Sequence, residues 1–268
     1  MNRAFLTFTC AAIVGFVALG IDRQAELPDA EGSFSLVPEA YAKTNAAHAK
    51  MKAAYRKRLI NDFLKLWTDP FEKTVFTNRW LGVETQQNPN DMWITQEILF
   101  EVKPDFMVEA GTRHGGSAAI WAMILEQINP DARVITIDIE DQVTDAKKLD
   151  IVRRKVDFLV GSSTDPEIVA EVKRRTKGKK VVVLLDSAHD KEHVLNELNA
   201  YSPLVGVGSY LIVQDTIVNG HPVWPEYGPG PYEAVEEFMA TNDDFKIDRT
   251  RERLLVTLCR KGFLKRIK

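Results

Sequence analysis

Two apolar runs of the sequence each end in an acidic side chain. Asp186 closes the run VVVLLD, and Asp215 closes the run LIVQD. Carboxylate oxygens are the ligands that a hard cation such as Mg²⁺ prefers, and such a cation can bind and acidify a substrate hydroxyl. His189 follows Asp186 by three residues, close enough to act as a general base. The alternative interpretation is that both acids cap the following helices and that His189 has only a structural role.

A glycine-rich turn follows an earlier apolar run, in the stretch VEAGTRHGGS. It contains Glu109, Gly111, Thr112, Gly115 and Ser117. Glycines let a ligand approach the backbone, and the helix predicted to begin at Ser117 offers free N–H groups. Glu109 would repel a pyrophosphate, whereas S-adenosylmethionine carries a cationic sulfonium and an amino group. The turn therefore favours S-adenosylmethionine (SAM), although a tight turn requires glycine even without a ligand.

Two further polar positions close the next two apolar runs. Asp138 ends ITID, and an acid there could accept hydrogen bonds from both ribose hydroxyls of a nucleoside. Ser162 and Ser163 follow FLVG, where small hydroxyls could meet an adenine edge. Each position could equally be a helix cap, and the Asp165–Pro166 pair favours a helix start directly after the serines.

A long segment after Asp215 contains a second histidine, His221, within NGHPV. Residues 217–231 and residues 67–92 carry aromatic side chains and turn signals but no readable periodicity. Long loops of this kind often form substrate walls. We predict that both loops border the acceptor site and that His221 is the reserve candidate for the base.

Short apolar runs alternate with helical segments over most of the chain, and this alternation positions the polar side chains. The predicted strands cover residues 106–110, 133–138, 156–160, 180–186 and 209–215. The predicted helices cover residues 92–102, 117–128, 144–153, 165–175, 190–200 and 231–240. Strands that are apolar on both faces and alternate with helices indicate a parallel sheet covered on both sides. Ligands bind at the carboxyl ends of such strands, where nearly all the candidate residues fall.

The C-terminal part departs from this alternation. Residues 245–249 and 254–260 read as two strands with a short turn between them, which predicts an antiparallel hairpin at the sheet edge. Parallel βα units that end in a reversed strand indicate an α/β fold of the Rossmann-like class I methyltransferase type. We therefore expect a mostly parallel seven-stranded sheet with helices on both faces.

The composition of the 268 residues fits a soluble globular domain, with 45% hydrophobic and 27% charged residues. The formal net charge of -3 argues against a nucleic-acid partner. Cys10 and Cys259 are the only cysteines, so neither a disulfide framework nor a cysteine-based zinc site is expected. Both a monomer and a homo-oligomer stay open.

The N-terminal segment has a composition of its own. Residues 1–21 are apolar and resemble a signal segment or a short membrane anchor, with a dispensable extension as the alternative. Residues 22–45 read as a linker, and residues 46–268 as the catalytic domain. We expect that domain to be cytoplasmic and to touch a membrane only through the N-terminal segment. Apolar residues at helical spacing from Met51 to Leu66 predict a helix with a basic solvated face.

Five motifs in order resemble the cephalosporin hydroxylase and rhamnosyl O-methyltransferase family. They are QNPNDMWITQEIL, VEAGTRHGGSA, LLDSAHDKEHVLNEL, IVQDTIVNGHPV and GPGPYEAVEEF. The resemblance covers roughly residues 60–265 and implies the class I methyltransferase fold, SAM and Mg²⁺. It also implies that Asp186, Gln214 and Asp215 are the metal ligands. The position of Gln214 is usually occupied by an acidic residue in the family, so the amide side chain of Gln214 predicts a weaker metal site.

We therefore predict a SAM-dependent, Mg²⁺-assisted O-methyltransferase that acts on a hydroxyl of a sugar or a glycosylated small molecule. The residues expected to bind SAM are Glu109, Gly111, Thr112, Gly115, Ser117, Asp138, Ser162, Ser163 and Asp186. His189 is the expected base. Two alternatives stay open: a hydroxylase or methoxylation component of a natural-product pathway, and a non-catalytic scaffold that binds the cofactor.

Overall fold

The computed structural model describes residues 53–72 and 74–268. The predictions for residues 1–21 and 22–45, and for the first residues of the predicted domain, lie outside this part. Its α-helices are α2 (Ala53–Trp67), α3 (Pro89–Val102), α4 (Gly116–Ile128), α5 (Asp150–Lys155), α6 (Pro166–Thr176), α7 (Lys191–Tyr201) and α8 (Pro231–Thr241). Its strands are β1 (Arg79–Trp80), β2 (Val83–Glu84), β3 (Phe106–Ala110), β4 (Arg133–Asp138), β5 (Val156–Val160), β6 (Val181–Leu185), β7 (Tyr210–Val213), β8 (Phe245–Ile247) and β9 (Phe263–Arg266). Short 3₁₀ helices are η1 (Val75–Thr77), η2 (Ala146–Lys148), η3 (Ser202–Leu204) and η4 (Arg249–Glu252).

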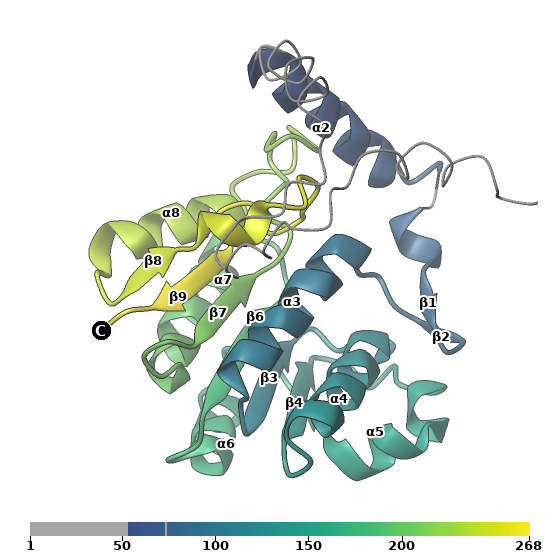
Figure 1. Ribbon diagram of the computed structural model, residues 1–268, viewed down its shortest axis with the longest axis vertical. Coiled ribbons are helices and arrows are strands. Elements are labelled where there is room, and N and C mark those ends of the chain that lie inside the picture. Colours follow the sequence, from purple (N-terminus) through teal and green to yellow (C-terminus); the bar gives the residue numbers. More distant parts are fainter. Residues whose placement is uncertain (1–52, 73) are drawn as a thin grey trace, which may run out of the picture. The chain divides into compact units, whose positions relative to one another are not determined.

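The main sheet has seven strands in the order β5-β4-β3-β6-β7-β9-β8 (Figure 1). Its first five strands are parallel, and β9 pairs antiparallel with both β7 and β8. The parallel registers bring the carboxyl ends of these strands level at one edge of the sheet, with Ala110 opposite Ile137 and Leu185. The predicted fold class is therefore confirmed.

Alternate residues of the strands enter two separate cores, as the two-residue period of a strand requires. Met107, Val182 and Leu184 pack on one face with α3, α4 and α5. Val108 and Val183 pack on the other face with α6, α7 and α8. Because both faces are buried, the central strands read in the sequence as continuous apolar runs.

The C-terminal hairpin differs from its prediction. The final strand is β9, and residues 254–260 form no strand but belong to a long connection that begins with η4. This connection is held by buried polar contacts, because the Asp91 carboxylate of α3 accepts hydrogen bonds from Thr257 Oγ1 and the Leu258 amide. A strand at this position would have to give up these bonds.

One predicted helix is also corrected. Residues 144–153 form two short pieces, η2 and α5, instead of one helix. The other predicted helices agree with the structure to within a few residues. Among these, α3 begins at Pro89, because the Asn88 side chain caps its N-terminus.

Helix α2 packs on the long loop that follows β7. Leu64 of α2 is fully buried in a small apolar cluster with Ile217, Val218, Val223 and Leu258. No helix in the described part of the chain is long and apolar enough to cross a membrane.

Candidate active site

A cavity of about 420 Å³ lies at the carboxyl ends of the parallel strands. This volume lies within the range of small-molecule sites. The predicted site residues that line it are Gly111, Thr112, Ser117, Asp138, Ser162, Ser163, Asp186, His189 and Asp215. The structure therefore brings together residues from distant parts of the sequence, since each lies at or shortly after the carboxyl end of a strand at the same sheet edge.

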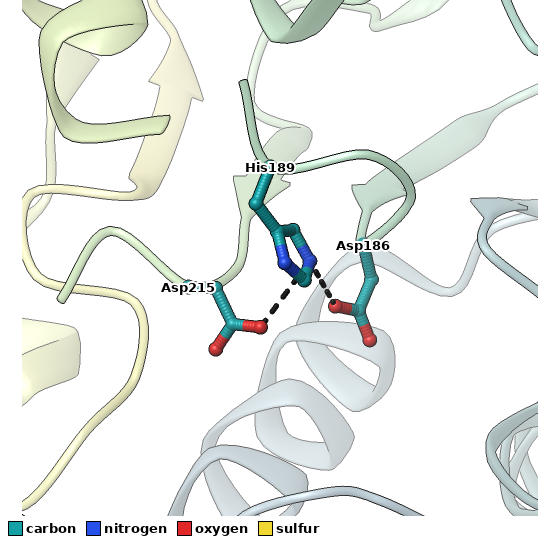
Figure 2. A group of neighbouring side chains, drawn as sticks. All are labelled: Asp186, His189 and Asp215. Atoms are coloured by element: carbon teal, nitrogen blue, oxygen red, sulfur yellow. Dashed lines mark ion pairs between the residues drawn. The ribbon is translucent and has the colours of Figure 1, made fainter. Parts of the chain in front are cut away.

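Asp186, His189 and Asp215 all line this cavity, and their side chains converge on one another (Figure 2). His189 Nε2 lies 3.5 Å from Asp186 Oδ1 and 3.2 Å from Asp215 Oδ2. One potential ligand atom from each of the three side chains lies within 4.8 Å of the others. The grouping arises because Asp186 follows β6 and Asp215 follows the adjacent β7.

The charges of this group are not balanced by protein contacts. Burial raises the pKa of Asp186, and the neighbouring Asp215 carboxylate raises it further. Burial by itself lowers the pKa of His189, but the carboxylates of Asp215 and Asp186 outweigh burial and raise it. His189 Nε2 is buried and forms no well-directed hydrogen bond. The two carboxylates supply the oxygen ligands that fit a hard divalent cation, and the imidazole nitrogen beside them has no other partner among the described residues.

Gln87 completes this group, and the sequence prediction missed it. Its Nε2 donates to Asp186 Oδ2 at 2.8 Å, and its Oε1 accepts a hydrogen bond from Gln214 Nε2 at 2.7 Å. Gln214 is buried and does not line the cavity, so its side chain reaches Asp186 only through Gln87. The one available signal was the position of Gln87 inside the QNPND motif.

Glu109 lies behind the cavity wall and has no exposed surface. Its carboxylate accepts hydrogen bonds from Trp121 Nε1 at 2.9 Å and from Thr136 Oγ1 at 2.7 Å. Burial raises its pKa to about 7, although these hydrogen bonds act in the opposite direction. Thr136 Oγ1 also pairs with the hydroxyl of Thr112, which lines the cavity. Glu109 thus supports the turn from inside and does not itself face the cavity.

Asp138 faces the cavity and is held in place by the glycine-rich turn. Its Oδ2 accepts a hydrogen bond of 2.7 Å from the amide of Arg113, whose φ of 46° is in the left-handed region. The sequence assigned no role to Arg113; in the structure its backbone orients Asp138.

Two other predicted residues lie outside the cavity lining. His221 stacks on Tyr232 and lies 2.8 Å from Glu233 Oε1, so it belongs to a separate contact beside α8. Gly115 does not line the cavity, and a Cβ added to it would lie 3.0 Å from Ala146 Cβ and 3.1 Å from Val143 Cγ1. Because His221 is not part of the group formed by Asp186, His189 and Asp215 (the cation group), the described residues offer one histidine and two carboxylates there. The two-histidine, one-carboxylate set typical of oxygen-activating iron is not formed by them.

Known proteins are similar to this chain over most of its length. The Rhamnosyl O-methyltransferase/CmcI family model matches residues 72–267. The rhamnosyl O-methyltransferase of Mycobacterium bovis (strain BCG / Pasteur 1173P2) is 40% identical over 178 residues, covering 65% of this chain and 71% of the relative. That of Mycobacterium leprae (strain TN) is 38% identical over 195 residues, covering 70% and 82%. A solved structure of CmcI with Mg and SAM has a TM-score of 0.56 at 21% identity, covering 71% of this chain and 77% of the other.

The chain belongs to the Rhamnosyl O-methyltransferase/CmcI family. The family resemblance predicted from five motifs is thereby confirmed. So is the prediction of a SAM-dependent O-methyltransferase. The likeness to CmcI confirms the class I methyltransferase fold.

Proposed function

We propose that this methyltransferase transfers the methyl group of SAM to a hydroxyl of a sugar, with the help of a divalent cation such as Mg²⁺. The observation that carries the proposal is the grouping of Asp186, His189 and Asp215 in the lining of the cavity. Asp186 and Asp215 would hold the cation, with Gln87 fixing the second oxygen of Asp186. A bound cation supplies a positive charge that binds and acidifies a hydroxyl.

The rest of the cavity suits the methyl donor. Asp138 presents its carboxylate where it can accept hydrogen bonds from ribose hydroxyls. Gly111, Thr112 and Ser117 form the wall between Asp138 and the cation group, where the methionine part of SAM would lie. Glu109 would act on the cavity wall indirectly, because it accepts a hydrogen bond from Thr136, whose hydroxyl in turn pairs with that of Thr112.

His189 is the proposed base, because its Nε2 lies between the two carboxylates and has no other well-directed partner. In the absence of a cation the carboxylates favour the protonated imidazole, which cannot accept a proton. His189 can therefore take the hydroxyl proton only when a cation shares the charge of Asp186 and Asp215. In-line positioning of the two reactants would supply much of the remaining rate.

The proposed acceptor is a rhamnose hydroxyl in a glycosylated small molecule. The support is the activity named for the curated relatives, which are 38–40% identical to this chain. The described residues also place exposed aromatic side chains, Trp224 and Tyr227, in the loop after β7. Aromatic faces of this kind can pack on the apolar side of a sugar ring.

Calorimetric titration with SAM, with and without Mg²⁺, tests the cofactor part of the proposal. We expect SAM to bind, and Mg²⁺ to bind to the same protein in a manner that requires Asp186 and Asp215. Folded protein that binds no SAM in either condition would refute the proposed function.

A further inference from the structure

A buried carboxylate that the proposed reaction does not use lies beside the cavity. Glu197 of α7 has no exposed surface. Its Oε1 accepts hydrogen bonds from two hydroxyls, those of Ser163 and Ser187, and the Ser187 bond is 2.6 Å long. Within the described part of the chain its other oxygen, Oε2, has no hydrogen-bond partner. One oxygen of Glu197 thus accepts hydrogen bonds from two serines that lie in different loops.

Both serines line the cavity, so their orientation determines what a ligand meets there. A serine hydroxyl has one proton to donate and two lone pairs that accept. Because each proton points inward to Glu197, each oxygen can only accept on its remaining side. His193 Nε2 lies 3.0 Å from Ser163 Oγ and 3.4 Å from Glu197 Oε1, so a protonated Nε2 would use part of the accepting capacity of that serine. Among the described residues, Ser187 Oγ forms no hydrogen bond besides the one it donates to Glu197, so both of its lone pairs stay free for a ligand.

The position of the two serines indicates which part of SAM they would meet. Ser163 follows β5, the strand next to β4, at whose end Asp138 is placed to bind the ribose. The cation group, where the methyl group must lie, follows β6 and β7 on the other side of β3. The base, joined to the ribose, would therefore lie towards the loop that carries Ser163. Ser187 follows β6, but its hydroxyl lies near that of Ser163 because both donate to the same oxygen of Glu197.

We propose that Glu197 is a positioning residue that selects an amino-substituted purine at this end of the cavity. By drawing the protons of Ser163 and Ser187 inward, it leaves an edge of acceptors. The 6-amino group of adenine can donate to this edge. A 6-oxopurine such as hypoxanthine would place a carbonyl against the same acceptors. The inference rests on the proposed function, since it names the chemistry of the base within the proposed SAM site.

The competing explanation is that Glu197 only ties α7 to the loops that carry Ser163 and Ser187. A purely structural role predicts that loss of the carboxylate weakens all nucleoside ligands equally. A positioning role predicts a change in the ratio of two affinities. The decisive readout is therefore a comparison of two ligands that differ only at the base.

The experiment measures calorimetric dissociation constants for S-adenosylhomocysteine and for S-inosylhomocysteine, its 6-oxo analogue, using the full chain with Mg²⁺. We expect the wild-type protein to bind the adenine compound about tenfold more tightly or better, which corresponds to about one buried hydrogen bond. Glu197→Met removes the acceptor but keeps a buried side chain of similar length. In this variant the serine hydroxyls are free to donate, and the ratio should fall several-fold towards one.

Ser187→Ala is the second variant, and it carries the test if thermal unfolding shows that Glu197→Met does not fold. It should also lower the ratio, because it removes one acceptor from the cavity edge. Ser202→Ala, which removes a hydroxyl outside the cavity, is the matched control and should keep the wild-type ratio.

Three outcomes would contradict one of the two proposals. Equal affinity of the wild-type protein for the two ligands would overturn the role of Glu197 while leaving the SAM site intact. An unchanged ratio in folded Glu197→Met and Ser187→Ala would do the same. A folded wild-type protein that binds neither ligand would instead refute the proposed function itself.

Discussion

At the scale of single residues, the site depends on how buried side chains orient those that face the cavity. Gln87 holds Asp186, and the Arg113 amide holds Asp138. The sequence predicted the acids that face the cavity, because each follows an apolar strand. It could not predict Gln87, because the contact with Asp186 joins residues 99 positions apart through a loop without periodicity.

Gln87→Ala should weaken cation binding about tenfold, as is typical when a residue that orients a metal ligand is lost. The reason is that Asp186 Oδ2 loses its donor and the carboxylate can rotate. Gln86→Ala is a matched control, since Gln86 bonds to Glu84 and not to Asp186. The measurement is calorimetric titration with Mg²⁺. Equal cation affinity in the two variants would contradict the orienting role of Gln87.

Glu109 makes the stability of the protein depend on pH. Because burial raises its folded-state pKa to about 7 from an ordinary 4.5, the folded protein holds a proton that the unfolded chain releases. This contribution is fully present below pH 4.5, is lost as the pH rises to about 7, and stays lost above that value. Between pH 4.5 and about pH 7, the free energy of unfolding falls by at most about 3 kcal/mol through this group.

Glu109→Gln removes this titration while keeping a polar side chain for Trp121 and Thr136. The free energy of unfolding of the variant minus that of the wild type should therefore be larger at about pH 8 than at about pH 5. Denaturant unfolding at both pH values measures the difference. A stability difference between variant and wild type that is the same at both pH values would show that Glu109 does not titrate in this window.

At the scale of elements, the parallel part of the sheet was predictable and its closing edge was not. The strands β6 and β7 are apolar on both faces, and this pattern is typical of a covered parallel sheet. The final strand β9 was misplaced because residues 254–260 contain an apolar run of strand-like composition. Polar contacts with Asp91 hold that run in a loop, and such long-range contacts leave no local pattern in the sequence.

At Gly111, the turn after β3 lies so close to the turn after β6 that no side chain fits between them. A Cβ added to Gly111 would lie 1.9 Å from the carbonyl oxygen of Asp186, and its φ is +98°. Gly111→Ala should therefore lower the free energy of unfolding by about 2 kcal/mol or more, in addition to the cost of placing an alanine in the left-handed region. The reason is that the two strand ends would have to separate. The same shift would displace Asp186 from the cation group.

Gly208→Ala is the control for Gly111→Ala. Gly208 has a similar φ of +86° but no atom within 4 Å of an added Cβ. The Gly208→Ala variant should lose only about 1–2 kcal/mol of its free energy of unfolding, which is the usual cost of an alanine in the left-handed region. Chemical denaturation of both variants measures the difference. Equal losses would show that the contact with Asp186 is not tight.

At the scale of the whole molecule, the sheet assembles one reaction site from residues spread over about half of the chain. The cofactor would lie along the ends of β5, β4 and β3, and the cation group lies at the ends of β6 and β7. The order of the motifs predicted this arrangement. The orientation of individual side chains, such as the inward position of Glu109 and the separation of His221, required the folded structure.

Methyl transfer from isotopically labelled SAM to a rhamnoside is the most direct test of the proposed function. The wild-type protein should label the acceptor with Mg²⁺ and lose this activity with a chelator. Asp215→Asn should lose at least about a hundredfold in turnover, since the amide removes one cation ligand charge. Asp190→Asn, which alters only the capping acid of α7, should keep the activity. Labelling that persists in Asp215→Asn or in the presence of the chelator would contradict the account.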